Sequence, residues 1–289
     1  MSSFEAVCIA HHSLLPEAAE LAERIVARYQ DRCRWWVANE MTLAHEEADD
    51  RLRDTDLIIT VGGDGTILRG MHAASLHSIP VLGVNMGRVG FMSEIDSRDA
   101  LEGIEWYLKG NGRIDERAML MATLGGDAGQ SMHALNDVTV HRGAELRMIE
   151  VKAVVDDVEL STYRGDGLIV ATSTGSTGYS LQLGGPVIDP NAPVFLLKAI
   201  AAHMSQFGGV VLDANSVLEL TLDSTANATL TVDGYISRNI HEGDAVTISR
   251  SERCARFLRG GPKSGFWEGL SHRLGMRIGA VRRGEETSN

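Results

Sequence analysis

Positive charge is scarce in this sequence. The 289 residues include 27 Lys and Arg against 39 Asp and Glu, which gives a formal net charge of −12 at pH 7. Lysine is especially rare and occurs only at Lys109, Lys152, Lys198 and Lys263. Affinity for nucleic acid comes largely from Lys and Arg that neutralise phosphates, so this composition argues against a nucleic-acid partner. Any phosphate ligand has to be bound by groups other than lysine.

Long apolar runs and cysteine pairs are also missing. No stretch of about 18 apolar residues occurs, which argues against a membrane partner. The N-terminus lacks the basic and apolar regions of a secretory signal. The three cysteines, Cys8, Cys33 and Cys254, are far apart and form no CxxC pair. We therefore expect reduced structural thiols in a cytoplasmic protein.

Strands and helices alternate over the first 112 residues. Apolar runs predict strands at 4–10, 35–37, 57–61 and 80–84. Helices are expected to begin at Pro16, to follow Thr66, and to follow Ser97 as an N-cap. This alternation predicts an open parallel sheet with helices on its faces.

From about residue 113 the pattern changes to short β-type runs, which favours an antiparallel meander or sandwich. Strands are expected at 118–124, 132–141, 148–156, 158–164, 167–172, 209–212, 217–222, 228–232 and 245–249, and one helix at 194–206. We predict an α/β nucleotide-binding domain at 1–115, a β-rich domain at 116–262 and a C-terminal segment at 263–289. This last segment has helical patches at 266–274, packs on the first domain, and is disordered from Arg282.

A glycine-rich turn, Gly62-Gly63-Asp64-Gly65-Thr66, follows the third strand and opens a helix. Glycines let the backbone approach a ligand closely, and N–H groups at a helix start bind an anion without any lysine. Asp64 lies among those donors, where it can orient a metal or accept a proton from a hydroxyl. A plain turn with Asp64 as the N-cap is the alternative. The spacing fits neither a Walker loop nor a G-x-G-x-x-G fingerprint.

A second motif, Asn136-Asp137, lies inside a β-type run. Adjacent side chains on a strand point to opposite faces, so such a pair usually ends or kinks the strand. An amide beside a carboxylate can also bind a ribose diol by donating and accepting hydrogen bonds. The residues alone leave both a β-bulge and a ribose site open.

A third motif runs from Tyr163 to Ser180, where an apolar strand leads into a hydroxyl-rich turn, and Gly184-Gly185-Pro186 follows it. The turn offers neutral hydrogen-bond donors and acceptors to a polar ligand. Tyr179 is available for stacking on a base or ring. A purely structural Ser/Thr/Gly loop is the alternative.

Together these segments resemble the NAD kinase family, the ATP- or polyphosphate-dependent NAD 2′-phosphotransferases. The resemblance covers roughly residues 55–240 and follows the family's order of motifs. The matching stretches are 62–66 for GGDGT, 83–91 for G-x-N-x-G-x-x-G-F, Asn136-Asp137 for its Asn-Glu/Asp pair, 164–167 for R-x-D-G, and 172–180 for TPTGSTAYS. Diacylglycerol and sphingosine kinases share GGDGT, and the long third motif separates the two groups.

The resemblance implies a role for each matching residue. Asp64 matches the general base for the adenosine 2′-hydroxyl, Arg69 matches a phosphate-facing basic residue, and Asn136 and Asp137 match the pair that binds ribose hydroxyls. The further substrate or nucleotide contacts that it implies are Gly62, Gly63, Gly65, Thr66, Asn85, Phe91, Arg147, Arg164, Asp166, Thr174, Thr177, Gly178, Tyr179, Ser180, Gln182 and Tyr235.

The resemblance also implies a Rossmann-like α/β domain, a β-sandwich domain and a C-terminal segment that returns to the first domain. NAD and either ATP or polyphosphate are the implied substrates, with Mg²⁺ as the divalent cation and a homodimer or homotetramer as the assembly. The sequence departs from the family pattern at several places: Ser173 replaces Pro, Gly178 replaces Ala, and Tyr235 replaces Gln. Gln182 and Leu183 replace a Ser and an Ala, and the helix expected in 193–207 replaces a proline-rich segment. A lipid kinase and a dinucleotide-binding regulator without turnover are the alternative hypotheses.

Overall fold

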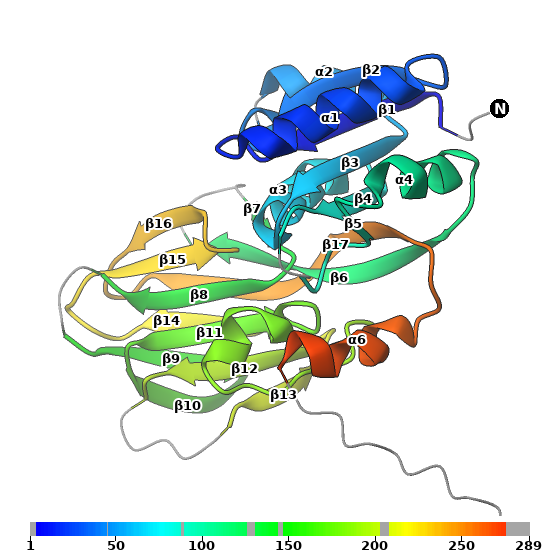
Figure 1. Cartoon of the computed structure of the whole chain (residues 1–289). Coiled ribbons are helices and arrows are strands. Elements are labelled where there is room, and N and C mark those ends of the chain that lie inside the picture. Colours follow the sequence, from blue (N-terminus) through cyan, green and yellow to red (C-terminus); the bar gives the residue numbers. More distant parts are fainter. Residues whose placement is uncertain are drawn as a thin grey trace, which may run out of the picture.

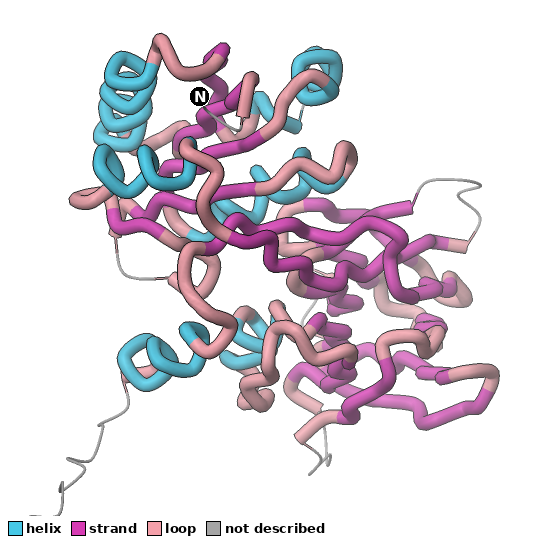
Figure 2. The backbone as a smooth tube through the Cα atoms, turned by 90° about the vertical axis from the view of Figure 1, so that its right-hand side faces the viewer, coloured by secondary structure: helices cyan, strands magenta, loops and turns pink. Residues whose placement is uncertain are grey.

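We describe a computed structural model of the chain, which covers residues 4–44, 46–87, 90–125, 131–143, 147–202 and 208–275. Within these residues the strands form one 11-stranded sheet and one 6-stranded sheet. Figure 2 shows that most helices surround the upper end of the molecule, while the lower end consists mainly of strands with further helices on its left side. In the described part, no helix is long and apolar enough to cross a membrane.

The N-terminal part is the predicted α/β layer structure. Four parallel strands lie in the order β4-β3-β1-β2. Their bounds are β1 (Ala6–His11), β2 (Arg34–Asn39), β3 (Leu57–Gly62) and β4 (Val81–Asn85), with the short β5 (Ile95–Asp96) beside β4. The helices are α1 (Pro16–Tyr29), α2 (Glu46–Arg53), α3 (Asp64–Ser75) and α4 (Ala100–Leu108), with a 3-10 turn η1 (Thr42–Ala44).

Helices cover both faces of these strands. On one face, α1 buries Leu21 and Ile25 together with residues of α4 in a common core. On the other face, α2 and α3 pack through Leu52 and Met71 against the opposite side of the same strands. The 3.6-residue spacing of apolar positions in α1 predicts this burial. The predicted N-cap was wrong by two residues, because α4 is capped at Asp99 rather than Ser97.

The large sheet continues from the α/β layer into the β-rich part of the chain. Its path runs from β4 through β17 (Ala245–Arg259), β14 (Leu218–Leu222) and β9 (Ile149–Val155) to β10 (Val158–Gly165). The connection depends on the distal end of β17, where Phe257 pairs with Val81. Along its length β17 also pairs with β6 (Arg113–Leu124), which in turn pairs with β7 (Ser131–Ala134). The predicted boundary near residue 115 therefore falls on a strand shared by both parts.

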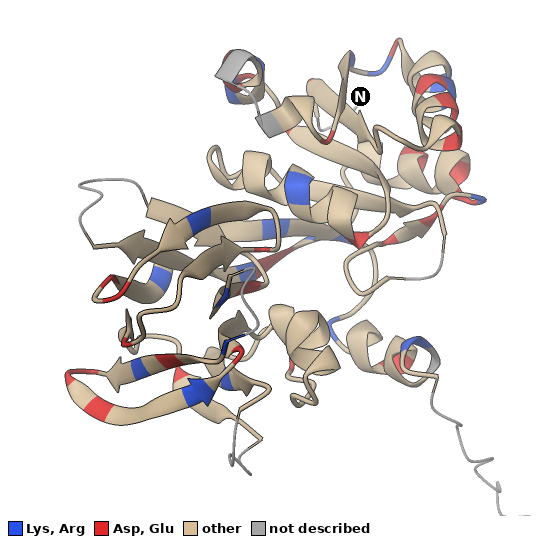
Figure 3. Cartoon of the chain, turned by 90° about the vertical axis from the view of Figure 1, so that its left-hand side faces the viewer, with Lys and Arg blue, Asp and Glu red and all other residues tan. Residues whose placement is uncertain are grey.

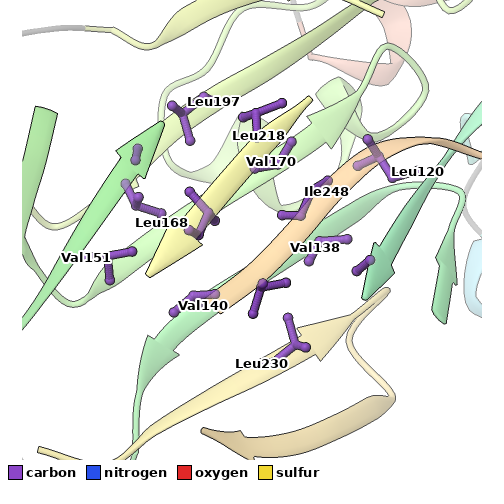
Figure 4. Close-up of a cluster of buried hydrophobic side chains, with 14 of the residues drawn as sticks. Leu120, Val138, Val140, Val151, Leu168, Val170, Leu197, Leu218, Leu230 and Ile248 are labelled. Atoms are coloured by element: carbon purple, nitrogen blue, oxygen red, sulfur yellow. The ribbon is translucent and has the colours of Figure 1, made fainter. Parts of the chain in front are cut away.

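The smaller sheet is antiparallel throughout, with the order β13-β12-β11-β8-β15-β16. These strands are β8 (Asp137–Arg142), β11 (Gly167–Thr172), β12 (Val194–Ile200), β13 (Val210–Asp213), β15 (Ala228–Val232) and β16 (Ile236–Ile240). Side chains from both sheets form one core, in which Leu168 and Val138 face Val151 and Ile248 (Figure 4). The predicted β-sandwich is thereby confirmed (Figure 1).

The expected helix at 194–206 was wrong. Residues 194–200 form β12, which pairs with β11 on one side and β13 on the other. A short apolar run such as this one has no periodicity that separates a buried helix from a central strand, and the tertiary pairing decides. Residues 203–207 lie outside the described part. Strand β16 was not predicted, because most of its side chains are polar and exposed.

Three short elements complete the described structure. The third motif contains the 3-10 turn η2 (Gly175–Thr177) and the helix α5 (Tyr179–Gln182). After β17 the chain forms α6 (Gly265–Arg273), which confirms the helical patches expected near the C-terminus. Phe266 of α6 contacts Phe91 with ring centroids 6.4 Å apart, so α6 returns to the loop after β4. The predicted disorder from Arg282 concerns residues outside the described part.

Candidate active site

The glycine turn after β3 fixes Asp64 at the first position of α3, with Gly63 as the N-cap. Gly62 is required by packing, because a Cβ there would lie 2.3 Å from Thr66 Oγ1. At Gly63 and Gly65 a Cβ would meet no atom within 4 Å. One side of the turn is therefore open space next to the N–H groups of a helix start, which is the arrangement that binds anions.

The loop after β4 orients the Asp64 carboxylate. The backbone N–H groups of Phe91 and Met92 donate to its two oxygens at 2.9 and 3.2 Å. Gly90 lies against the same carboxylate, where a Cβ would be 2.0 Å from Oδ1. Asn85 braces the start of this loop by donating from Nδ2 to the Gly87 carbonyl at 2.9 Å. The turn at 62–66 and the loop after β4 thus form one structural unit around Asp64.

The middle and end of α3 contact the smaller sheet. The Arg69 guanidinium lies 4.7 Å from the centre of the Tyr235 ring, at the turn between β15 and β16. His72 Nε2 lies 2.5 Å from Asp233 Oδ2, and the His72 ring packs edge-on against Tyr235. This single helix therefore connects Asp64 at its start with the β-rich part near its end (Figure 1).

Asp233 positions the Asn136-Asp137 pair, a role that the sequence analysis missed. Its carboxylate accepts hydrogen bonds from the backbone N–H groups of Leu135, Asn136 and Asp137, at 2.7, 2.7 and 2.9 Å. Asp233 has a φ of +48°, a left-handed conformation that Asp adopts more readily than most residues. Its place directly before Gly234 and after an expected strand was the available signal for a functional turn.

The β-type run is interrupted at Leu135 and Asn136, between β7 and β8, and Asp137 is the first residue of β8. Asp137 is only 7% exposed, and burial, with a smaller contribution from the Asp233 charge, raises its pKa to about 7. Asn136 Oδ1 is buried and has no hydrogen-bond partner among the described residues. An unsatisfied buried acceptor costs free energy, so Asn136 is suited to a ligand that donates a hydrogen bond.

A cavity of about 580 Å³ opens beside this pair. Four predicted site residues line it: Asn136, Asp137, Asp166 and Tyr179. In the same lining, Arg142 Nε donates to Asp166 Oδ1 at 2.7 Å. The remaining wall is formed by Thr139, His141, Gly143, Ile200, Thr231, Asp233 and Gly234. The lining combines hydroxyls, carboxylates and an exposed Tyr179 ring, and it suits a polar ligand that carries hydroxyls and an aromatic ring.

The hydroxyl-rich turn of the third motif is largely satisfied by its own hydrogen bonds. Ser173 Oγ donates to the Ala192 carbonyl, Ser176 Oγ to the Ser173 carbonyl, and Thr177 Oγ1 to the Thr174 carbonyl. Ser180 Oγ differs, because it is buried without a hydrogen-bond partner among the described residues. Gly175 packs so closely on the Asn136 carbonyl that a Cβ would lie 2.0 Å from its oxygen. The turn mainly shapes the wall around Asn136.

Other predicted site residues lie away from the cavity wall. Arg164 is exposed and lies 3.6 Å from Glu150, and Arg147 is exposed two residues before β9 begins. Tyr235 packs against Arg69 and His72 rather than lining the cavity. Gln182 is exposed at the end of α5, and Gly178 lies against the Asn136 side chain. Among the described residues no three His, Cys, Asp or Glu side chains form a group that could bind a metal.

Comparison with known proteins agrees with this geometry. Residues 27–112 match the ATP-NAD kinase N-terminal domain, and residues 135–260 match the ATP-NAD kinase C-terminal domain. An NAD kinase of Dehalococcoides mccartyi is 38% identical over 280 residues, which cover 94% of this chain and 96% of that protein. An NAD kinase of Chloroflexus aurantiacus is 40% identical over 223 residues, which cover 76% of this chain and 81% of that protein.

Solved structures show the same fold. The crystal structure of yeast NADH kinase complexed with NADH superimposes with a TM-score of 0.82 at 23% identity, covering 99% of this chain and 90% of that chain. An NAD kinase from Archaeoglobus fulgidus in complex with ATP has a TM-score of 0.76 at 25% identity, covering 94% and 100%. The fold and the matching domains define a phosphotransferase. Within that class, the chain belongs to the NAD kinase family.

Proposed function

We propose that this chain transfers the γ-phosphoryl group of ATP to the 2′-hydroxyl of the adenosine ribose of NAD, which gives NADP. The observation that carries the proposal is the setting of Asp64, at an open helix start and on the same helix that contacts the Asn136-Asp137 support. Membership of the NAD kinase family and the activity named for its relatives agree with it. The comparisons give no support to a lipid kinase or a regulator without turnover.

In this proposal Asp64 is the general base. The ribose 2′-oxygen forms a bond to the γ-phosphorus, the bond between that phosphorus and the β–γ bridging oxygen breaks, and ADP leaves. Asp64 accepts the hydroxyl proton, and the loop N–H groups of Phe91 and Met92 keep its carboxylate in place. Phosphoryl transfer of this kind depends mainly on positioning and on stabilising charge. The N–H groups of the turn at 62–66 stabilise the phosphate oxygens.

The cavity beside Asn136 and Asp137 is the proposed dinucleotide site. Asn136 and Asp137 bind ribose hydroxyls, since one offers an orphaned buried acceptor and the other a carboxyl near its pKa at neutral pH. Tyr179 stacks on a ring of the substrate, and Asp166 contacts the substrate from the cavity lining. The other contacts that we propose are Gly62, Gly63, Gly65, Thr66, Arg69, Asn85, Phe91, Arg147, Arg164, Thr174, Thr177, Gly178, Ser180, Gln182 and Tyr235.

The reaction also calls for a divalent cation, Mg²⁺ in our proposal. Because the described residues contain no three-ligand group, Asp64 and the donor phosphates would hold the ion between them, as Mg²⁺ sites with substrate phosphates commonly do. Such an ion supplies positive charge to the phosphate oxygens. Inorganic polyphosphate offers the same phosphate chemistry as ATP and is the second donor in the proposal. We also propose that the protein is a cytoplasmic homodimer or homotetramer. No disulfide joins its three cysteines.

The direct test is Asp64→Asn, with Asp54→Asn as a control that makes the same change at an exposed position outside the site. NADP formation is measured enzymatically with each donor. We expect Asp64→Asn to lower kcat by about 10²–10⁴-fold, because it removes a positioned base while preserving the shape of the side chain. Activity of the folded Asp64→Asn protein within twofold of the control would show that Asp64 is not the base.

A further inference from the structure

A second cavity, of about 220 Å³, lies between the loop after β4 and helix α6. Five cationic side chains line it: Arg113 and Arg117 from β6, Arg259 from the end of β17, Lys263 from the following turn, and Arg273 from the end of α6. We call it the arginine cavity. Only two acidic side chains, Glu94 and Asp115, are in its lining. The sequence motifs point to none of these five cations.

This concentration of positive charge contrasts with the rest of the protein. The chain has a net charge of −12, and exposed acidic residues such as Glu17, Glu20 and Glu23 follow one another on the surface of α1 (Figure 3). The overall composition therefore does not explain a cavity whose lining has three more cations than carboxylates. The low-dielectric walls of a small cavity strengthen the attraction of an anion to such a group of charges.

The two carboxylates already form ion pairs with three of the arginines. Arg117 donates to Asp115 from both Nε and Nη2, and Arg113 Nη1 lies 3.3 Å from the other Asp115 oxygen. Arg259 Nη1 donates to Glu94 Oε2 at 3.1 Å. The acidic side chains thus neutralise part of the group and hold its members in place.

Arg273 has a donor to spare. Its Nε is buried and has no hydrogen-bond partner among the described residues. Burial and the nearby Arg259 charge lower the pKa of Arg273. Buried donors without partners and like charges held together both cost free energy, and an anion in the cavity would remove both costs. Guanidinium groups bind phosphate oxygens with well-matched paired hydrogen bonds, which favours phosphate as that anion.

The arginine cavity adjoins the residues that orient Asp64. Phe91 is part of its wall, and the Phe91 N–H donates to Asp64 Oδ2 at 2.9 Å. The Arg273 guanidinium lies 5.5 Å from the centre of the Phe91 ring, and the Asp64 charge acts on Arg273. None of the residues that line this cavity lines the proposed dinucleotide cavity. A ligand here would therefore lie beside the loop that orients Asp64 without competing for the ribose site.

We propose that the arginine cavity is a subsite for the phosphate chain of the phosphoryl donor. This inference rests on the proposed function, since it assigns a place to the donor of that reaction. The ligand chemistry is a linear chain of phosphate groups, whether in a nucleoside triphosphate or in inorganic polyphosphate. The cavity binds phosphates behind the one that is transferred, while the glycine turn at 62–66 receives the transferred group.

The binding test uses inorganic tripolyphosphate titrated calorimetrically into the full-length protein. Arg273→Gln removes a charge with unused buried donors, and we expect it to weaken tripolyphosphate binding by about ten- to hundredfold. Lys263→Ala removes an exposed cation, and its expected effect is about two- to fivefold. Arg53→Gln on α2 is the control, because it makes the same change as Arg273→Gln at an exposed position far from α6. It is expected to bind like the wild type.

The kinetic test compares KM values for ATP, for polyphosphate and for NAD. We expect Arg273→Gln and Lys263→Ala to raise the KM for a donor and leave the KM for NAD within twofold. A rise for ATP alone, or for polyphosphate alone, identifies the donor that occupies the cavity, and a rise for both shows that the phosphate chain itself is recognised. Unchanged donor KM values in both variants would overturn the inference.

The two proposals can fail separately. If the wild type forms no NADP from any donor, the proposed function is wrong, while the tripolyphosphate titration still tests the cavity. If the wild type forms NADP but does not bind tripolyphosphate, or if both variants bind it like the wild type, the subsite is wrong and the function stands. Circular dichroism identifies an Arg273→Gln protein that has lost its fold; Lys263 is exposed, so Lys263→Ala still decides the question.

Discussion

The two cavities bury charges of opposite sign. In the dinucleotide cavity, burial raises the pKa of Asp137 to about 7, with a further contribution from Asp233. In the arginine cavity, burial lowers the pKa of Arg117 and of Arg273. Desolvation of groups that line a cavity is typical of functional sites, because it prepares them for a ligand of complementary chemistry. An acid near neutrality suits hydroxyl groups, whereas crowded guanidinium groups suit phosphates.

Asp64 lines neither cavity, but it is connected to residues in the lining of each. Phe91 connects it to the arginine cavity by a backbone hydrogen bond. Helix α3 connects it to the dinucleotide cavity through the contact between His72 and Asp233. Backbone hydrogen bonds and helix α3 therefore position the Asp64 carboxylate, while the charged side chains that select the ligands lie in the two cavities.

Gly90→Ala gives the largest expected effect on this arrangement. The new Cβ would lie 2.0 Å from Asp64 Oδ1, so the carboxylate or its loop must move. A displacement of about 1 Å at a reacting group costs on the order of 100-fold in rate, and we expect kcat to fall by about that factor. Gly87→Ala is the matched control in the same loop, because a Cβ there meets no atom within 4 Å.

Steady-state kinetics and calorimetry together decide this prediction. Gly90→Ala is expected to bind NAD like the wild type, since neither Gly90 nor Asp64 lines the dinucleotide cavity. If Gly87→Ala and Gly90→Ala have the same kcat, the contact between Gly90 and Asp64 does not position the base.

Asp233→Asn is expected to weaken the dinucleotide side alone. The change replaces one acceptor oxygen with an NH₂ group that faces backbone N–H donors of residues 135–137, and it alters the contact to His72. Leaving a buried donor unsatisfied costs about 1–3 kcal/mol, so the free energy of unfolding should fall by about that amount. We also expect a higher KM for NAD and unchanged tripolyphosphate binding.

Chemical denaturation measures the loss, and Asp223→Asn provides the control because it makes the same change at an exposed position. Equal stability of the two variants would contradict the role of Asp233. A parallel rise in the KM for the donor would show that the two cavities are not independently supported.

Much of the fold and the central site residues could be predicted because their signals are local. The turn at 62–66 combines glycines, an acidic residue and a preceding strand within a few positions, and Asn136-Asp137 interrupts a β-type run. The length and chemistry of these motifs made the resemblance to the family specific. The structure agrees with both in placing Asp64 at a helix start and Asn136 and Asp137 at a cavity.

The features that were missed depend on contacts between distant residues. Asp233 acts on residues about one hundred positions earlier, and no local pattern indicates its partners. The arginine cavity combines β6 with the end of β17 and α6, so its charges are scattered in a sequence whose overall balance is acidic. The helix expected at 194–206 was wrong for the same reason, since pairing with β11 and β13 makes residues 194–200 a strand.

The raised pKa of Asp137 predicts a pH dependence of stability that the arginine cavity does not share. A carboxyl whose pKa rises from an unfolded value near 4 to about 7 binds more protons in the folded state between those values. Its contribution to stability is therefore complete below about pH 4 and is lost as the pH rises through about 7. We expect the stability of the wild type, relative to Asp137→Asn, to fall by at most about 1.4 kcal/mol per pH unit over this window.

Denaturation of both proteins at several pH values between 4.5 and 8 measures this difference, and Asp223→Asn again controls for the loss of an exposed carboxylate. Taking the difference between the two proteins cancels the titration of all other groups that the substitution leaves unchanged. A difference that is constant over the window would mean that Asp137 is ionised throughout and meets the ribose as a carboxylate. A falling difference means that the proton is retained near pH 7, so that Asp137 can donate as well as accept hydrogen bonds, unlike the arginine and lysine side chains of the other cavity, which can only donate.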